Sequence, residues 1–195
     1  MKVFVNCLTT FRFIFTLFLP FIKKYISNFS FISSIAVLFL TDFFDGKLAR
    51  KYNVQTIYGS AMDTIADKTL SIVLLFMLVK DIPILVYILI FEIIIALINI
   101  IAFLQGKKTK SSYSGKVKMW FLAISIIIGF MNNFKMINNT ILMITAFSTI
   151  IIQSITIIDY IKRLSHEKKH QDRIKWKDLK IILFDTNYYL TKNEI

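Results

Sequence analysis

The sequence predicts an all-α integral membrane protein with six transmembrane helices. Of its 195 residues 56% are hydrophobic, 19 are Phe, and the mean hydropathy is +0.64. Such a composition is typical of multispan membrane proteins and argues against a soluble domain. Apolar runs close to the length of about 20 residues that crosses a bilayer alternate with short polar stretches, and this alternation predicts the number of spans.

The first three spans are predicted within residues 7–79. The first covers residues 7–22 and includes Arg12, whose side chain we expect to snorkel towards the near membrane surface. The second begins with residues 29–40 and reaches membrane length only if the helix continues through Arg50. After a polar connection, the third covers residues 59–79, with its acidic residues in the first turns.

The last three spans are predicted within residues 82–161. Residues 82–104 form the clearest span, with Pro83 near its start, where the missing backbone donor does no harm. The fifth and sixth spans are expected over residues 114–131 and 140–161. We therefore predict one six-span membrane domain over residues 1–163, followed by a basic cytoplasmic tail over residues 164–195.

The distribution of basic residues predicts the orientation of the spans. Lys and Arg outnumber Asp and Glu by 24 to 12, and when both termini lie on one side, most Lys and Arg of the connections fall there too. The positive-inside rule makes this side cytoplasmic. We expect a multi-pass protein of the cell (inner, cytoplasmic) membrane. The basic excess is assigned to this topology and to anionic membrane lipids, and no nucleic-acid partner is predicted.

Four aspartates flank the cytoplasmic connection between the second and third predicted spans. Asp42 and Asp45 stand three residues apart, and Asp63 and Asp67 stand four apart, so each pair shares one face of its helix. Because a charge within a span costs about 2.5–3.5 kcal/mol, four carboxylates need compensating cations. Hard oxygen ligands suit Mg²⁺ or Mn²⁺, and four aspartates can hold two such ions.

Small residues and an arginine lie among these aspartates. Gly46, Ala49 and Gly59 lack bulky side chains where a metal-bound group must approach the backbone, which suits a nucleotide lying across the helices. Arg50 carries a planar cation that can grip phosphate oxygens. Each residue alone also fits ordinary helix packing or membrane topology, and it is their joint spacing that indicates a site.

This spacing resembles the signature of the CDP-alcohol phosphatidyltransferase family, D-x2-D-G-x2-A-R-x8-G-x3-D-x3-D. The chain matches every fixed position with Asp42, Asp45, Gly46, Ala49, Arg50, Gly59, Asp63 and Asp67. The resemblance implies a membrane enzyme that transfers the phosphatidyl group of CDP-diacylglycerol to an alcohol and releases CMP. It also implies a polar active-site cavity on the cytoplasmic side and a homodimer.

The resemblance further implies roles for the motif residues. Asp42, Asp45 and Asp63 would ligate two divalent ions, Mg²⁺ or Mn²⁺, and Asp67 would touch a metal and act as the general base on the acceptor hydroxyl. The CDP-lipid would be bound by Asp42, Gly46, Ala49, Arg50, Gly59 and Asp63. Because no separate nucleophile with a positioned base stands out, we expect direct transfer without a phosphoenzyme.

Three further segments resemble the phosphatidylglycerophosphate synthase branch of the family, whose acceptor is glycerol 3-phosphate. They are residues 6–12, 66–68 and 115–118. A phosphorylated acceptor needs cations beside the metal site. The candidates at predicted cytoplasmic span ends are Arg12, Lys68, Lys116 and Lys118.

Two departures from that branch keep other acceptors open. Phe91 precedes Glu92 where the branch has Arg-Glu, and Thr64 replaces a proline. Phosphatidylglycerol, as in cardiolipin synthase, and inositol phosphate therefore stay alternatives. A cation transporter or channel is an alternative of another class, although we find neither the broken helices nor the repeated halves typical of transporters. The intact aspartates argue against an inactive structural membrane protein.

Overall fold

The computed structural model describes residues 2–51, 57–104 and 113–166, and structural statements below refer to these residues. For residues 42–51 and 57–61 they concern the helical backbone alone. Contacts divide the chain into two compact units, with a boundary between Leu70 and Ser71. Of the described residues, the amino-terminal unit contains 2–51 and 57–70, and the carboxyl-terminal unit contains 71–104 and 113–166.

The described part of the chain is built from helices and contains no strand. The helices are α1 (Lys2–Ile22), α2 (Asn28–Lys51), α3 (Ile57–Val79), α4 (Leu85–Leu104), α5 (Tyr113–Asn133) and α6 (Asn139–His166). Each one coincides with a predicted span, shifted by a few residues at its ends. The all-α prediction and the number of helices are therefore confirmed for the described residues.

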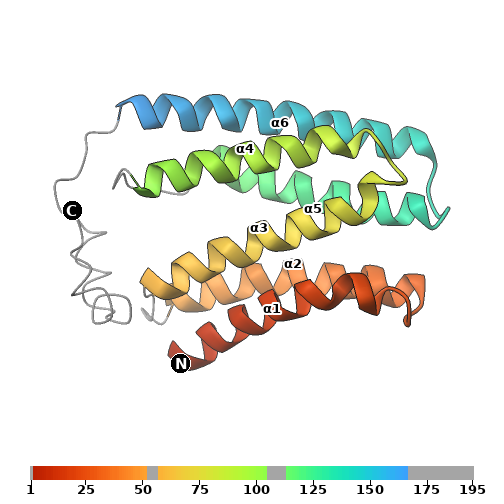
Figure 1. Cartoon of the computed structure of the whole chain (residues 1–195), viewed down its shortest axis with the longest axis horizontal. Coiled ribbons are helices and arrows are strands. Elements are labelled where there is room, and N and C mark those ends of the chain that lie inside the picture. Colours follow the sequence, from red (N-terminus) through yellow and green to blue (C-terminus); the bar gives the residue numbers. More distant parts are fainter. Residues whose placement is uncertain (1, 52–56, 105–112, 167–195) are drawn as a thin grey trace. The chain divides into compact units, whose positions relative to one another are not determined.

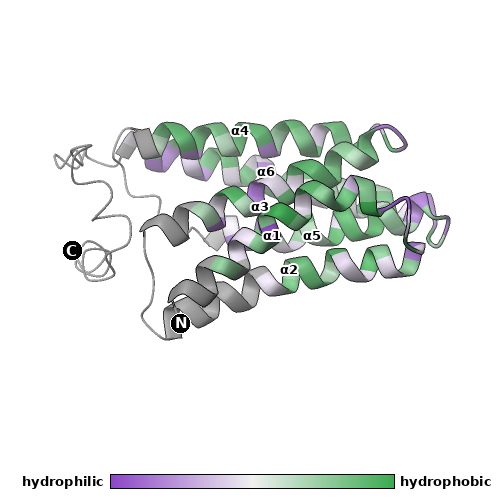
Figure 2. Ribbon diagram, turned by 60° about the horizontal axis from the view of Figure 1, so that its bottom comes forward, coloured by the Kyte–Doolittle hydropathy of each residue, from purple (hydrophilic) through white to green (hydrophobic). Residues whose placement is uncertain are grey.

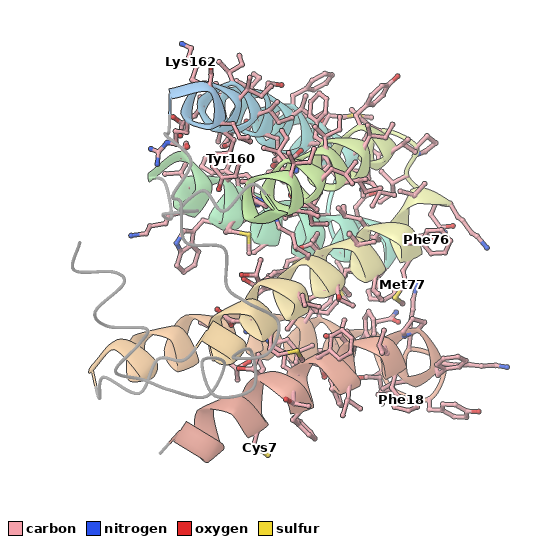
Figure 3. All side chains as sticks on the ribbon, turned by 60° about the vertical axis from the view of Figure 1, so that its left-hand side comes forward. Cys7, Phe18, Phe76, Met77, Tyr160 and Lys162 are labelled. Carbon is pink, nitrogen blue, oxygen red and sulfur yellow. The ribbon has the colours of Figure 1, made fainter. Side chains whose placement is uncertain are left out.

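In the amino-terminal unit, α1 and α2 lie side by side and are joined by a short turn (Figure 1). Ser27 caps α2, since its hydroxyl accepts a hydrogen bond from the Ser30 backbone N–H at 3.2 Å. Phe31 and Ile35 of α2 and Leu19 of α1 are buried in this unit. By contrast Phe18 of α1 points away from the ribbon, as expected for a side chain that faces lipid (Figure 3).

The motif lies on the ends of two helices. Helix α2 continues to Lys51, which confirms that the residues from Asp42 to Arg50 extend the second apolar run. Helix α3 begins at Ile57, two residues before the predicted start at Gly59, so Asp63 and Asp67 lie in its second and third turns. The backbone therefore presents all four aspartates on helices, two on α2 and two on α3.

In the carboxyl-terminal unit, α4 and α5 both pack against α6 (Figure 1). Their core consists of aliphatic and aromatic side chains, among them Leu85, Ile88, Leu122 and Phe130. Gly129 of α5 permits close packing, because an added Cβ would lie 2.9 Å from Leu78 Cδ1. Small residues serve this purpose widely in membrane helix packing.

Helix α4 begins at Leu85, three residues later than predicted. The preceding residues instead form a turn, in which the Ile82 N–H donates to the Leu78 carbonyl at 2.9 Å and the Leu85 N–H donates to the Ile82 carbonyl at 3.1 Å. Pro83 lies in this turn, where its missing N–H is not needed. Because Ile82 and Ile84 are apolar, hydropathy does not distinguish this turn from the helix that follows.

Among the described residues, three helices are long and apolar enough to cross a membrane. They contain the segments Leu85–Ala102, Ser114–Asn133 and Asn139–Ser165, and the first has a mean hydropathy of 2.8. Most of α4 and much of α6 carry hydrophobic residues (Figure 2). The described apolar stretches of α1 and α2, Thr9–Ile22 and Asn28–Thr41, are shorter. For α1 to α3 the crossing of the membrane stays a prediction.

The end of α6 changes the predicted boundary of the tail. The helix continues five residues beyond the predicted end at Ile161, so that the first residues assigned to the tail are helical. Lys162 extends from this end of the helix (Figure 3). The remaining tail, residues 167–195, lies outside the described residues, and its proposed role at the membrane surface stays a prediction.

Candidate functional site

Two predicted metal ligands share one buried cation in the amino-terminal unit. Nη2 of Arg12 lies 2.9 Å from Oδ1 of Asp63 and 3.2 Å from Oδ1 of Asp67. The Arg12 side chain is only 2% exposed, whereas the side chains of Asp63 and Asp67 are 39% and 21% exposed. The carboxylates thus have one side against a buried guanidinium and another side that is open.

The pattern of α1 places Arg12 inside the unit. Thr9, Arg12, Thr16 and Leu19 are buried and recur at the spacing of one helical face. The hydroxyl of Thr16 donates to the Arg12 carbonyl at 2.8 Å, which satisfies both groups within the helix. The prediction that Arg12 snorkels to the membrane surface was therefore wrong. Its charge is compensated inside the protein by carboxylates of α3 instead.

The arrangement of Asp63 and Asp67 fits a hard cation. Their spacing of four residues puts both carboxylates on one face of α3, and their Oδ1 atoms converge on a single cationic nitrogen. Carboxylate oxygens are the ligands that Mg²⁺ and Mn²⁺ prefer. The residues present therefore suit a divalent ion.

The other predicted ligands lie on α2, where the backbone alone is described. Asp42 and Asp45 share one face of its last turns by their spacing. Gly46, Ala49 and Arg50 follow on the same helix, and Gly59 lies in the first turn of α3. No group of three His, Cys, Asp or Glu side chains that could hold a metal occurs among the described residues, to which the side chains of Asp42 and Asp45 do not belong.

An apolar cavity of about 340 Å³ lies between α1 and α2 in the same unit. It is lined by Phe11, Arg12, Phe15, Ser33, Ser34, Val37, Leu38 and Thr41. Thr41 directly precedes Asp42, and Arg12 connects the cavity wall with Asp63 and Asp67. This cavity was not predicted from the sequence, because it depends on how the faces of two helices meet.

A second buried charge cluster lies in the carboxyl-terminal unit. Nζ of Lys118 on α5 donates to both carboxylate oxygens of Glu92 on α4, each at 2.9 Å. Nε2 of Gln153 on α6 donates to Oε2 of Glu92 at 3.2 Å and to the Ile88 carbonyl at 3.3 Å. The Lys118 side chain is 3% exposed and that of Glu92 is fully buried.

This second cluster bears on the residues expected to bind the acceptor. Lys118 was expected near the acceptor phosphate, and its ammonium group is held by Glu92. Lys116 on the same helix is exposed, and Lys68 on α3 is partly exposed beside Asp67. Gln153 was missed in the sequence, although a lone amide in the middle of an apolar span is a signal that such a cluster exists.

Comparison with known proteins adds a family and named relatives. The family model described as CDP-alcohol phosphatidyltransferase matches residues 2–152. A protein of Wigglesworthia glossinidia brevipalpis is 41% identical over 83 residues, covering 38% of this chain and 43% of that protein. A protein of Rickettsia bellii (strain RML369-C) is 54% identical over 41 residues, covering 21% of this chain and 23% of that protein.

Both relatives carry the name CDP-diacylglycerol--glycerol-3-phosphate 3-phosphatidyltransferase. A protein of Rickettsia felis (strain ATCC VR-1525 / URRWXCal2) has the same name and the same identity over 41 residues, which is 21% of this chain and 23% of that protein. The chain thus matches less than half the length of each of these relatives.

Proposed function

Since the chain belongs to the CDP-alcohol phosphatidyltransferase family, we propose that it transfers the phosphatidyl group of CDP-diacylglycerol to glycerol 3-phosphate. The acceptor hydroxyl would attack the lipid-linked phosphorus, the bond from this phosphorus to the CMP oxygen would break, and CMP would leave. The family match over residues 2–152, the complete aspartate motif and the printed names of the relatives support this proposal.

The observation that carries the proposal is the convergence of Asp63 and Asp67 on one cationic group. With Asp42 and Asp45 they are the proposed ligands of two Mg²⁺ or Mn²⁺ ions. When bound, such ions neutralise charge on a diphosphate and orient it for in-line displacement. The partly exposed side of the two carboxylates is where substrate oxygens can approach.

Asp67 is the proposed general base. It would accept the proton of the acceptor hydroxyl as the new phosphate ester bond forms. Its carboxylate is 21% exposed, so an acceptor can reach it. We propose transfer in one step. Trapping a covalent phosphatidyl-enzyme would contradict this step.

Nucleotide binding is proposed for the remaining motif residues. The CDP moiety would contact Asp42, Gly46, Ala49, Arg50, Gly59 and Asp63. Of the four cations considered for the acceptor phosphate, Lys116 is exposed and Lys68 partly so. Arg12 and Lys118 are buried. Because Lys116 and Lys68 are more exposed, we favour them as acceptor contacts.

The cellular setting is proposed on the same basis. The three apolar helices and the family support a multi-pass membrane protein. We propose that it lies in the inner (cytoplasmic) membrane among anionic lipids, that its active-site cavity faces the cytoplasm, and that it forms a homodimer.

A single assay tests the reaction and its acceptor. Membranes containing the protein are supplied with CDP-diacylglycerol, Mg²⁺ or Mn²⁺, and one acceptor at a time. The acceptors are glycerol 3-phosphate, phosphatidylglycerol and inositol phosphate. We expect CMP release and a new lipid with glycerol 3-phosphate. CMP release with another acceptor alone would reassign the substrate, and no acceptor-dependent CMP from folded protein would overturn the proposed function.

A further inference from the structure

We infer that Arg12 is a positioning residue for the metal ligands. Its guanidinium acts as an internal cation that holds Asp63 and Asp67 in the metal-free protein and competes with the divalent ion for their oxygens. This inference rests on the proposed metal site. It gives Arg12 a role other than contact with the acceptor phosphate.

The contacts of Arg12 are those of a bridge between two carboxylates. A single nitrogen, Nη2, lies within 2.9 Å of Asp63 Oδ1 and 3.2 Å of Asp67 Oδ1. Two carboxylates that share one site repel each other when both are ionised. The guanidinium offsets much of that repulsion, so that the two ligands can face the same point without a metal.

The burial of Arg12 keeps its guanidinium inside the protein. Its side chain is on the buried face of α1, between Thr9 and Thr16, and has almost no exposed surface. A buried cation needs a partner, because transfer away from water is strongly unfavourable for an unpaired charge. Arg12 therefore stays close to α3 whether or not a metal is present. The same burial makes it poorly placed to meet a diffusing acceptor.

The exposure of the two carboxylates explains how a metal can still bind. The side chains of Asp63 and Asp67 are 39% and 21% exposed although both contact Arg12. A divalent ion can therefore approach their oxygens but has to share them with Arg12. Arg12 thus stabilises the metal-free fold and lowers the affinity for metal, and removing it has opposite effects on these two quantities.

The test compares Arg12→Gln with the unaltered full chain in detergent or lipid nanodiscs, using Mn²⁺ alone as the probe. Without metal we expect a lower Tm for Arg12→Gln. Saturating Mn²⁺ should raise its Tm by more than it raises that of the unaltered protein, and half-saturation should occur at roughly tenfold lower Mn²⁺, because a competing charge is gone.

A matched control removes one exposed positive charge. Arg163 of α6 pairs with Asp159 at 3.3 Å one turn away and is about half exposed. Arg163→Gln should keep the Tm and the Mn²⁺ response of the unaltered protein. The conservative variant Arg12→Lys, which keeps the charge but lacks the guanidinium, should lie between Arg12→Gln and the unaltered protein in both measurements.

A second variant covers the case in which Arg12→Gln does not fold without metal. In Arg12→Gln/Asp67→Asn the charge removed from α1 is matched by one removed from α3. This double variant should be more stable without metal than Arg12→Gln alone. A double variant no more stable than the single one would overturn the inference.

Three other results would also overturn it. One is an equal fall in Tm for Arg12→Gln with and without Mn²⁺, which indicates packing alone. Another is an unchanged Tm and Mn²⁺ response with a raised acceptor KM, which indicates an acceptor contact. The third is that the unaltered protein releases CMP but its Tm does not change when Mn²⁺ is added. That result leaves the proposed function intact, so the two failures are distinguishable.

Discussion

The two units of the protein each bury a charge cluster, and the clusters differ in composition and in exposure to solvent. In the amino-terminal unit one cation, Arg12, faces two carboxylates that are partly exposed. In the carboxyl-terminal unit one cation, Lys118, faces one carboxylate, Glu92, and both are enclosed. The first cluster has partly exposed oxygens, whereas the second does not. Burial of charge is common to both, so the open side distinguishes the proposed ligand site.

The enclosed cluster has the features of a structural connection. Lys118, Glu92 and Gln153 come from α5, α4 and α6, so their hydrogen bonds join three helices. Both Glu92 oxygens are used by Lys118, which leaves little capacity for a ligand. Buried ion pairs of this kind contribute to a specific arrangement more than to net stability. We propose that this cluster sets the packing of α4 to α6.

The largest expected effect comes from the open cluster. Asp67→Asn removes the proposed base and should lower the rate of CMP release at least about 10²- to 10⁴-fold, the usual contribution of general base catalysis. Binding of CDP-diacylglycerol should largely survive. Both are measured on the same purified protein, with Asp81→Asn as a matched control in the exposed turn before α4. Near-normal turnover of Asp67→Asn would refute the assignment of the base.

Substitutions in the enclosed cluster should change the free energy of unfolding. Lys118→Met leaves Glu92 buried without its cation and should lower the free energy of unfolding by about 3–5 kcal/mol. Glu92→Leu/Lys118→Met removes both charges and should restore most of that loss. The comparison is made by unfolding in detergent, with Arg163→Gln changing stability by less than about 1 kcal/mol as an exposed pair. A double variant as unstable as the single one would show that the cluster does more than balance its own charges.

The helices could be predicted from the sequence because their signals are local. Apolar runs and polar turns indicate six helices, and the need for membrane length places the motif from Asp42 on the end of the second one, as the structure shows. The start of α4 could not be predicted to the residue. The turn around Pro83 consists of apolar residues, so its hydropathy equals that of the helix that follows.

The partners of the buried charges could not be predicted from the sequence. Arg12 and Asp63 are 51 residues apart, and Lys118 and Glu92 are 26 residues apart. The sequence shows that each charge needs compensation but not which helix faces meet. For this reason the sequence alone predicts that the Arg12 side chain snorkels to the membrane surface and that Lys118 contacts the acceptor phosphate. The motif could be found because its constraint is spacing along the chain, which the sequence displays directly.

A smaller effect is expected for Lys116, the exposed neighbour of the enclosed cluster. Lys116→Ala should raise the KM for glycerol 3-phosphate by about tenfold, because a hydrogen bond to a charged group contributes about 1.5–3 kcal/mol. The affinity for CDP-diacylglycerol should change less. Steady-state kinetics with each substrate varied in turn give both values, and Lys80→Ala, an exposed lysine after α3, is the control. A larger change in the affinity for CDP-diacylglycerol would assign Lys116 to nucleotide binding instead.

The smallest effect is expected for Gln153, and it shows which interaction holds the enclosed cluster. Gln153→Leu removes the hydrogen bonds of Nε2 to Glu92 and Ile88, which lowers stability. It also removes Oε1, which is buried and has no hydrogen-bond partner among the described residues, and this raises stability by a similar amount. The net change in the free energy of unfolding should therefore stay below about 1 kcal/mol, well under that of Lys118→Met. If Gln153→Leu is as destabilising as Lys118→Met, the amide is as necessary as the charge, and the cluster is a hydrogen-bond network rather than an ion pair.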